Sequence, residues 1–255
     1  MYRTFENRAI IQYTVNTISS LHIGGHGTTA PAEMDHQVIK NSSGFPIIPG
    51  SSLKGVFRTE LERLIKGLGI DTCTVPDVCK SKKKKDVETE CPVCLLFGGG
   101  ELAGSVRIKD ATARRQKTTV RDGVAIERKT RKAKDRAKYD IEVVPKGTEF
   151  GGEIVIENLN LSGHENAKLG GFLGLVEFFN ACSGSIGHAT SRGFGQVSIN
   201  IDNFRILTAD DYLNSNYDGK VYASGDAGFG EMKDEAIKNW GIFLKSLRKN
   251  PATGI

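Results

Sequence analysis

The chain has 255 residues, of which 38% are hydrophobic and 25% are charged, a balance typical of a soluble globular protein. No apolar run approaches the ~20 residues of a membrane span, and the N-terminus lacks the apolar core of an export signal. We therefore expect no membrane partner and a cytoplasmic location. The formal net charge of +5 is modest, but it is unevenly distributed along the chain.

The first predicted element is a strand over residues 8–20, where apolar and polar residues alternate. The glycine-containing loop that follows carries His22 and, further on, Asp35. Asp35 has the chemistry to hold a divalent cation or to deprotonate an attacking hydroxyl, and the alternative is a loop aspartate that caps a turn. His22, beside glycine residues, is a candidate for phosphate contact or acid–base work. Each signal on its own also fits an ordinary loop.

A segment framed by prolines leads into the first predicted helix. Gly50-Ser51-Ser52 is predicted to form a turn in which a serine oxygen caps the helix. From Leu53 onward, apolar residues recur at helical spacing, and Gly67 or Gly69 is expected to end the helix. The free amides at such a helix start, together with Lys54, suit a phosphate. An ordinary capped helix fits the same pattern.

Four of the five cysteines fall in residues 70–100, a segment expected to be an insertion. Cys73 and Cys79 form one pair, and Cys91 and Cys94 form a second pair with two residues between them. In a cytoplasmic protein such thiols favour metal binding over disulfides. Four sulfurs would complete a closed, tetrahedral zinc site with a structural role. A redox pair and unliganded thiols are the alternatives.

A basic arm is predicted over residues 113–142, which are polar and poor in apolar residues. Residues 114–138 alone hold 11 Lys or Arg against three acidic residues, and a second lysine cluster lies within residues 80–85. We expect the arm to protrude as a hairpin that gains order on binding. Such uneven charge indicates a polyanion such as nucleic acid, although solvated loops are also charged.

The remaining predicted elements alternate between strands and helices. In chain order they are strands over residues 105–111 and 153–159, a helix over 166–183, a strand over 196–202, and a last helix over 231–248. A glycine-rich loop, residues 184–195, includes Ser191-Arg192-Gly193-Phe194-Gly195, which fits either a phosphate contact or a tight turn. The order of elements is the split β-α-β pattern of ferredoxin-like folds. We therefore predict an α+β fold with an antiparallel sheet and two helices on one face.

Six motifs occur in an order that resembles the RAMP superfamily, and within it the repeated backbone subunit of type III CRISPR effector complexes, most like the III-A form. The motifs are Leu21-His22-Ile23-Gly24, Pro49-Gly50-Ser51-Ser52-Leu53-Lys54-Gly55, Cys94-Leu95-Leu96-Phe97-Gly98, 121–130, 142–148 and Arg192-Gly193-Phe194-Gly195. Where this family usually has an aliphatic-Asp-Ser/Asn-Pro-Val run, the chain reads Met34-Asp35-His36-Gln37-Val38.

The resemblance implies a modified RRM-like palm over residues 1–206, with a zinc-binding lid inserted at 70–100 and a protruding thumb hairpin at 113–150. Residues 207–255 would be a C-terminal extension, partly helical, that the resemblance does not cover. Copies of such a subunit stack as a filament along one guide (CRISPR) RNA. Each thumb intrudes between the guide and the target RNA and displaces a base.

The resemblance also implies roles for individual residues. Asp35 would be catalytic, and a divalent cation, Mg²⁺ or Mn²⁺, would assist attack of the neighbouring 2′-hydroxyl on the phosphate of the target RNA. Zinc would lie in the lid. The residues implied to contact RNA are His22, Ser51, Ser52, Lys54, Arg58, Arg121, Arg128, Lys129, Ser191, Arg192, Gly193 and Gly195.

Three functions follow as hypotheses. The first is a guide-RNA-binding backbone subunit that cleaves target RNA through Asp35, with other type III effector subunits as partners. The second is an architectural RNA-binding subunit of the same complex without activity. The third is a guide-processing endoribonuclease of the same superfamily, which would act as a monomer with a histidine acid–base pair.

Overall fold

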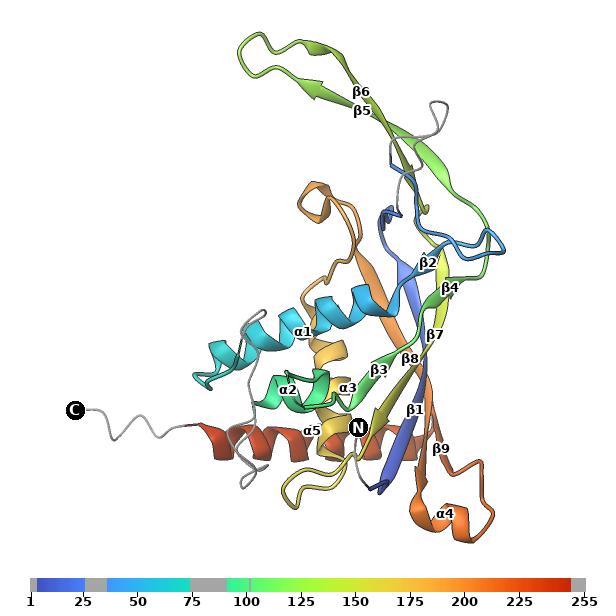
Figure 1. The fold of residues 1–255 in the computed structure, drawn as a ribbon, viewed down its shortest axis with the longest axis vertical. Helices are drawn as coiled ribbons and strands as arrows, with labels where there is room; N and C mark the ends of the chain where they lie inside the picture. The colour runs from blue at the N-terminus through green and yellow to red at the C-terminus, as the bar shows by residue number, and fades with distance from the viewer. Residues whose placement is uncertain (1–3, 26–35, 74–90, 101, 249–255) are drawn as a thin grey trace, which may run out of the picture.

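A computed structural model describes residues 4–25, 36–73, 91–100 and 102–248 of the chain. Its centre is one antiparallel sheet with the strand order β2-β4-β7-β1-β8-β9, and β3 also pairs with β7 (Figure 1). The strands of this sheet are β1 (Asn7–Thr17), β2 (Ile47–Ile48), β3 (Val106–Ile108), β4 (Ala111–Ala113), β7 (Glu149–Glu157), β8 (Val197–Thr208) and β9 (Lys220–Ala223).

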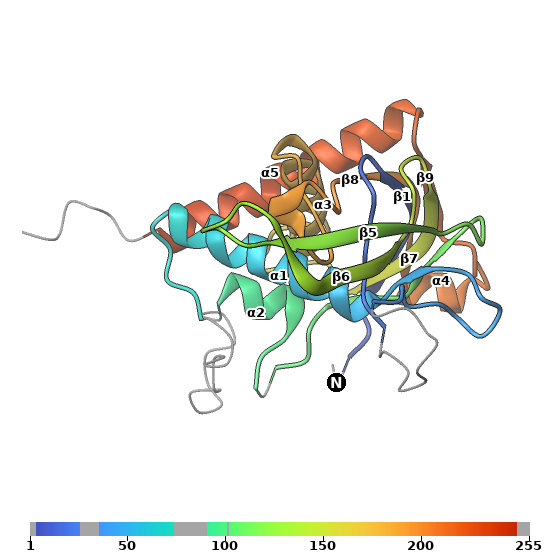
Figure 2. The same ribbon diagram turned by 90° about the horizontal axis from the view of Figure 1, so that it is seen from above.

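The helices of the described residues lie mainly on one side of this sheet. They are α1 (Gly50–Gly67), α2 (Pro92–Phe97), α3 (Ala167–Ala181), α4 (Ala209–Leu213) and α5 (Ala227–Leu247). Figure 2 shows α5, α3, α1 and α2 side by side in that order, while α4 lies apart at the end of the sheet. None of these described helices is long and apolar enough to cross a membrane.

The connections between strands give the ferredoxin-like arrangement. Helix α1 follows β1 and the short β2 and leads through α2 to β3 and β4, whereas α3 follows β7 and leads to β8. Because β7 inserts between β4 and β1, each helix crosses over a strand that runs antiparallel to its neighbours. The predicted α+β fold, with two helices packed on one face of an antiparallel sheet, is confirmed.

Alternation along β1 divides the sheet into a buried and a polar face. Tyr13 and Val15 are buried beneath the helices, whereas Gln12 points to the other face and hydrogen-bonds Glu153. In the core, the Phe57 ring of α1 lies edge-on to two aromatic rings of α3. These rings are Phe172, at 5.3 Å between ring centroids, and Phe179, at 5.6 Å. Such pairs contribute about 0.5–1.5 kcal/mol each beyond burial of their area.

Helix α1 begins at Gly50, and no side chain of its own segment caps it. The predicted serine cap is therefore wrong. Instead, the Gly50 amide donates a hydrogen bond of 2.8 Å to Oδ1 of Asp110, in the turn between β3 and β4. A Cβ at Gly50 would lie 2.1 Å from the Ile108 carbonyl oxygen, so only glycine permits this approach. The same turn divides the predicted strand over 105–111 into β3 and β4.

The basic arm is an antiparallel hairpin of β5 (Thr119–Ile126) and β6 (Ala133–Val143), which projects beyond the sheet (Figure 1). The Tyr139 side chain covers Gly123 on the opposite strand, where a Cβ would lie 2.3 Å from the ring. Arg128 and Lys129 lie exposed in the turn at its tip. The hairpin therefore presents positive charge at a distance from the core.

The residues beyond 206 share the core of the fold. Strand β9 pairs with β8, and α5 packs along α3. Two glycines of α3 allow this close approach: a Cβ at Gly170 would lie 1.9 Å from the Ala236 carbonyl oxygen, and one at Gly171 would lie 2.7 Å from the Trp240 ring. The last predicted helix thus begins earlier than expected, at residue 227.

Replacing Gly170 with alanine tests this helix contact. We expect Gly170→Ala to lower the free energy of unfolding by about 3 kcal/mol, because the added methyl collides with backbone of α5 that cannot yield locally. The matched control is Gly241→Ala in α5, where a Cβ meets no atom within 4 Å. It should stabilise the protein by about 0.5–1 kcal/mol through helix propensity alone. Equal effects in urea unfolding would contradict the packing of α5 on α3.

Candidate functional site

Three histidines meet where the β5–β6 hairpin joins the sheet. His22 is buried, and its Nδ1 lies 2.7 Å from the backbone oxygen of Glu142 on β6. Because a carbonyl oxygen only accepts, Nδ1 carries the hydrogen and donates it to Glu142. The exposed rings of His36 and His188 lie edge-on to His22, at 6.3 and 6.0 Å between centroids. The result is a row of imidazoles with a buried centre and open ends.

The Glu142 side chain fastens residues 36–40 to the hairpin. It accepts hydrogen bonds from the Val38 amide (3.0 Å), the Lys40 ammonium (2.5 Å) and the Thr118 hydroxyl (2.6 Å). Burial alone raises the pKa of the Glu142 carboxyl, but these bonds outweigh burial and hold the pKa below its usual value. The carboxylate is therefore ionised and fully engaged.

His36 is held by the backbone as well. Its carbonyl oxygen accepts a hydrogen bond of 2.9 Å from the Glu142 amide, and its ring lies 6.2 Å from that of Tyr139. The predicted catalytic residue, Asp35, immediately precedes His36 and lies outside the described residues. The chain thus re-enters the described structure at the base of the hairpin.

The glycine-rich loop reaches the same place. The His188 amide donates to the His22 carbonyl oxygen at 2.8 Å. Gly195 has φ +77, and a Cβ there would lie 2.0 Å from the Ile186 carbonyl oxygen. Next to it, the Arg121 guanidinium of β5 lies 5.1 Å above the Phe194 ring. The loop, the hairpin and His22 are therefore in contact, and Ser191, Arg192 and Gly193 are exposed beside them.

The start of α1 is joined to this region through residues 36–48. The Ile47 amide donates at 3.1 Å to the carbonyl oxygen of Ile39, which lies within the segment that Glu142 holds. At the helix itself Ser51 is exposed and Ser52 is half-buried. Lys54 Nζ donates to the Val106 carbonyl oxygen at 3.1 Å, and burial, followed by the positive charge of Arg58, lowers the pKa of Lys54.

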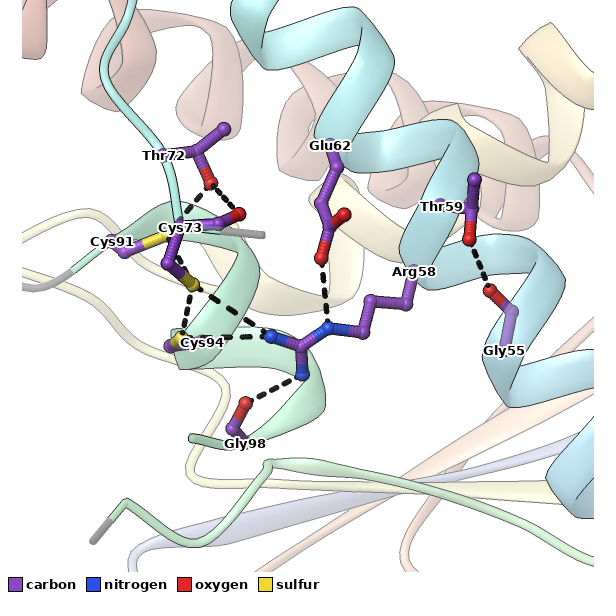
Figure 3. A network of polar contacts seen from close by, with 9 residues as sticks. All are labelled: Gly55, Arg58, Thr59, Glu62, Thr72, Cys73, Cys91, Cys94 and Gly98. Carbon is purple, nitrogen blue, oxygen red and sulfur yellow. Dashed lines mark hydrogen bonds and ion pairs between the residues drawn. The ribbon is translucent and has the colours of Figure 1, made fainter. Parts of the chain in front are cut away.

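Arg58 points away from this region and into the cysteine cluster (Figure 3). Its Nε donates to Glu62 at 2.9 Å, and Nη1 donates to the Gly98 carbonyl oxygen at 2.7 Å. Its Nη2 lies 3.8 Å from the sulfurs of both Cys73 and Cys94. Of the residues expected to hold RNA, Arg58 is thus the one whose guanidinium is engaged in the interior.

The three described cysteines of the insertion form a compact cluster. The Sγ atoms of Cys73, Cys91 and Cys94 all lie within 4.8 Å of one another. Burial alone raises the pKa of the Cys91 thiol, but hydrogen bonds from the Thr72 hydroxyl and nearby backbone amides outweigh it and lower the pKa. Three converging sulfurs, of which Cys91 has a lowered pKa, fit a soft or borderline metal such as zinc. Cys79 lies outside the described residues.

Several residues of the site were not predicted from the sequence. Glu142 belongs to one of the six motifs, but nothing in its spacing shows that it is buried against Lys40. His188 lies in the predicted glycine-rich loop. A histidine in such a loop, here between a glycine and an alanine, was the signal that could have identified it as a site residue. The Arg121–Phe194 contact joins two predicted segments.

Comparison with known proteins gives a consistent result. A family model described as "RAMPs: RAMP superfamily" matches residues 14–198. The chain is 26% identical over 256 aligned residues to a protein of Methanocaldococcus jannaschii, covering 93% of this chain and 96% of that relative. It is 31% identical to one of Mycobacterium tuberculosis (72% and 83% covered) and 27% identical to one of Enterococcus italicus (77% and 91% covered). All three are named "CRISPR system Cms endoribonuclease Csm3".

The lowered pKa of the buried Glu142 carboxyl predicts how the free energy of unfolding depends on pH. Glu142 has a lower pKa folded than the about 4.3 of an unfolded glutamate, so its contribution is complete at neutral pH and disappears as the pH falls through the folded value. Glu142→Gln should lower the free energy of unfolding by about 1–3 kcal/mol at neutral pH, because amide hydrogen bonds replace charge-assisted ones. The deficit should shrink in acid.

Urea unfolding at neutral pH and near pH 3 measures both effects. The control is Glu177→Gln, which breaks a surface ion pair with Lys233 and should cost a few tenths of a kcal/mol at most. A deficit of Glu142→Gln that stays the same at both pH values would contradict the ionised, buried carboxylate.

Proposed function

The chain belongs to the RAMP superfamily, and on that premise we propose that it is a guide-RNA-binding backbone subunit of a type III CRISPR ribonucleoprotein that cleaves complementary target RNA at each copy. The observation that carries the proposal is the convergence of His22, the segment after Asp35, the glycine-rich loop and the base of a basic hairpin. His22 and Glu142, which meet here, are 120 residues apart in the sequence, and an extended polyanion would touch all of these segments.

Guide RNA is proposed to run from the start of α1 to the glycine-rich loop. Serine hydroxyls, lysine and exposed backbone amides beside glycines are groups that bind phosphates without reading sequence. The proposed contacts are His22, Ser51, Ser52, Lys54, Arg121, Arg128, Lys129, Ser191, Arg192, Gly193 and Gly195. Arg58 leaves this set because its guanidinium is occupied by Glu62, Gly98 and the cysteine sulfurs.

The hairpin is proposed to serve as the thumb of this subunit, and the insertion at 70–100 as its lid. Three apolar residues of β5 are exposed on the hairpin: Val120, Val124 and Ile126. Apolar side chains on a basic arm suit insertion between stacked bases, with the charge following the phosphates. We further propose that copies of the chain stack in a filament and bind the other type III effector subunits. The proposed location of this assembly is the cytoplasm.

Cleavage is assigned to Asp35. A divalent cation, Mg²⁺ or Mn²⁺, held by this carboxylate and by RNA oxygens would neutralise charge on the phosphate during attack by the 2′-hydroxyl. His36 follows Asp35 directly, and hydrogen bonds from and to Glu142 hold residues 36–38 at the base of the hairpin. Separately, Cys73, Cys91 and Cys94, with Cys79 from outside the described residues, are proposed to hold a structural zinc.

A second function has an observation in its favour. The row of His22, His36 and His188 offers the imidazole pair that a metal-independent, guide-processing endoribonuclease needs. Such an enzyme would cut a precursor RNA hairpin in the presence of a chelator. An architectural subunit without activity is the remaining alternative.

Asp35→Ala in the complex assembled on guide RNA tests the catalytic assignment. We expect cleavage of a complementary RNA to fall by at least about 100-fold, while guide binding and assembly stay unchanged. The control is Asp122→Ala, which removes an exposed carboxylate from the hairpin. Cleavage that persists in Asp35→Ala would refute the assignment, and cleavage in the presence of EDTA would favour the histidine-based alternative.

Lys54→Gln tests the guide contact at the start of α1. Loss of one phosphate contact should weaken binding of RNA to a similar degree for any sequence and lower the slope of log K against log salt by about 1. Thermal unfolding separates this from the loss of the hydrogen bond to Val106. Lys66→Gln, at the other end of the same helix, is the control and should leave the slope unchanged.

A further inference from the structure

Arg58 occupies a place in the fold that RNA binding does not explain. Its side chain is only 14% exposed, and its N–H groups contact four residues, Glu62, Gly98, Cys73 and Cys94. Two of those contacts are the sulfurs of Cys73 and Cys94, which are themselves 3.1 Å apart. In Figure 3 the guanidinium lies between α1, which carries it, and the sulfur cluster.

The charge of the cluster explains why an arginine is needed there. A divalent metal bound by three or more thiolates carries a net negative charge, and a buried charge is costly unless an opposite charge and hydrogen bonds accompany it. N–H donors aimed at sulfur supply both. The planar guanidinium also reaches two sulfurs with one nitrogen while its other nitrogens bind oxygen, a geometry that a lysine ammonium lacks.

The contacts behind Arg58 hold it in this orientation. Glu62, one turn further along α1 and 7% exposed, accepts from Nε, and the Gly98 carbonyl oxygen accepts from Nη1. Gly98 is itself fixed: its φ is +91, and a Cβ there would lie 2.9 Å from the Gly104 amide nitrogen. The guanidinium is thus preorganised by a helix on one side and by the end of α2 on the other.

We infer that Arg58 is the positioning residue of the Cys73–Cys91–Cys94 metal site, where it balances the thiolate charge and fastens the site to α1 and to the end of α2. The inference rests on the proposed zinc site. It concerns metal affinity and the joint between α1 and α2. Guide RNA and target cleavage play no part in it.

Zinc affinity of the full chain, measured by competition with a chromogenic chelator, tests this role. We expect Arg58→Gln to lower the affinity by about 10- to 100-fold, the usual effect of removing a hydrogen-bonding partner of metal ligands. Arg58→Lys should not restore it. The matched control is Arg63→Gln. Arg63 lies on the same helix, its side chain is 73% exposed, and it pairs with Glu60. The zinc affinity of this control should equal that of the wild type.

Two further measurements separate this role from a general loss of structure. Removing N–H donors from sulfur should shift the thiolate-to-cobalt charge-transfer band of the Co²⁺-substituted protein to lower energy in Arg58→Gln, and not in Arg63→Gln. Glu62→Gln, which leaves the guanidinium in place, should fold and give a smaller loss of zinc affinity even where Arg58→Gln is poorly folded.

The outcomes distinguish the proposals. Zinc bound by the wild type and equally by Arg58→Gln, with an unshifted cobalt band, overturns the role of Arg58 alone. A wild type that binds no zinc overturns the metal site and this inference with it, but not the RNA-binding function. Zinc-loaded Arg58→Gln that has lost guide RNA binding as strongly as Lys54→Gln would return Arg58 to the RNA contacts.

Discussion

One buried carboxylate holds the functional region together. An ionised side chain that is 3% exposed is stable only when its partners are in place, and Glu142 has an ammonium, a hydroxyl and an amide as its partners. The backbone of the same residue accepts from His22 and donates to His36. These bonds join the hairpin, the segment after Asp35 and the loop after β1, which are also linked by backbone hydrogen bonds of Leu21 with Val144 and of Ile39 with Ile23.

Helix α1 divides the protein into two chemical environments. Lys54 and Arg58 are one turn apart, yet the first lies near the exposed start of the helix and the second reaches into the sulfur cluster. Each of these two parts of α1 has its own anchor. The Asp110 carboxylate accepts from the first amide of the helix, and the Gly98 carbonyl oxygen accepts from the Arg58 guanidinium. A polar ligand at the start of α1 and a metal beside its middle would therefore act on the same helix.

Local patterns predicted most of the fold, and contacts distant in the sequence account for the differences. Helical spacing from Leu53 to Ile65 identified α1 because periodicity depends on neighbours three and four residues away. The cap of that helix was mispredicted because its acceptor, Asp110, lies 60 residues further along the chain. The place of Arg58 depends on sulfurs 15 and 36 residues away, which no spacing reveals.

The hairpin is a long arm that is anchored at its base by the contacts of Glu142 with Val38, Lys40 and Thr118. Strand β5 has eight residues, which at about 3.3 Å per residue gives an arm of roughly 26 Å. A tilt of about 5° at this base moves the tip by about 2 Å, which is more than half the distance between stacked bases along one nucleic-acid strand. Small rearrangements around Lys40 and Thr118 are therefore magnified at Arg128 and Lys129, where the arm ends.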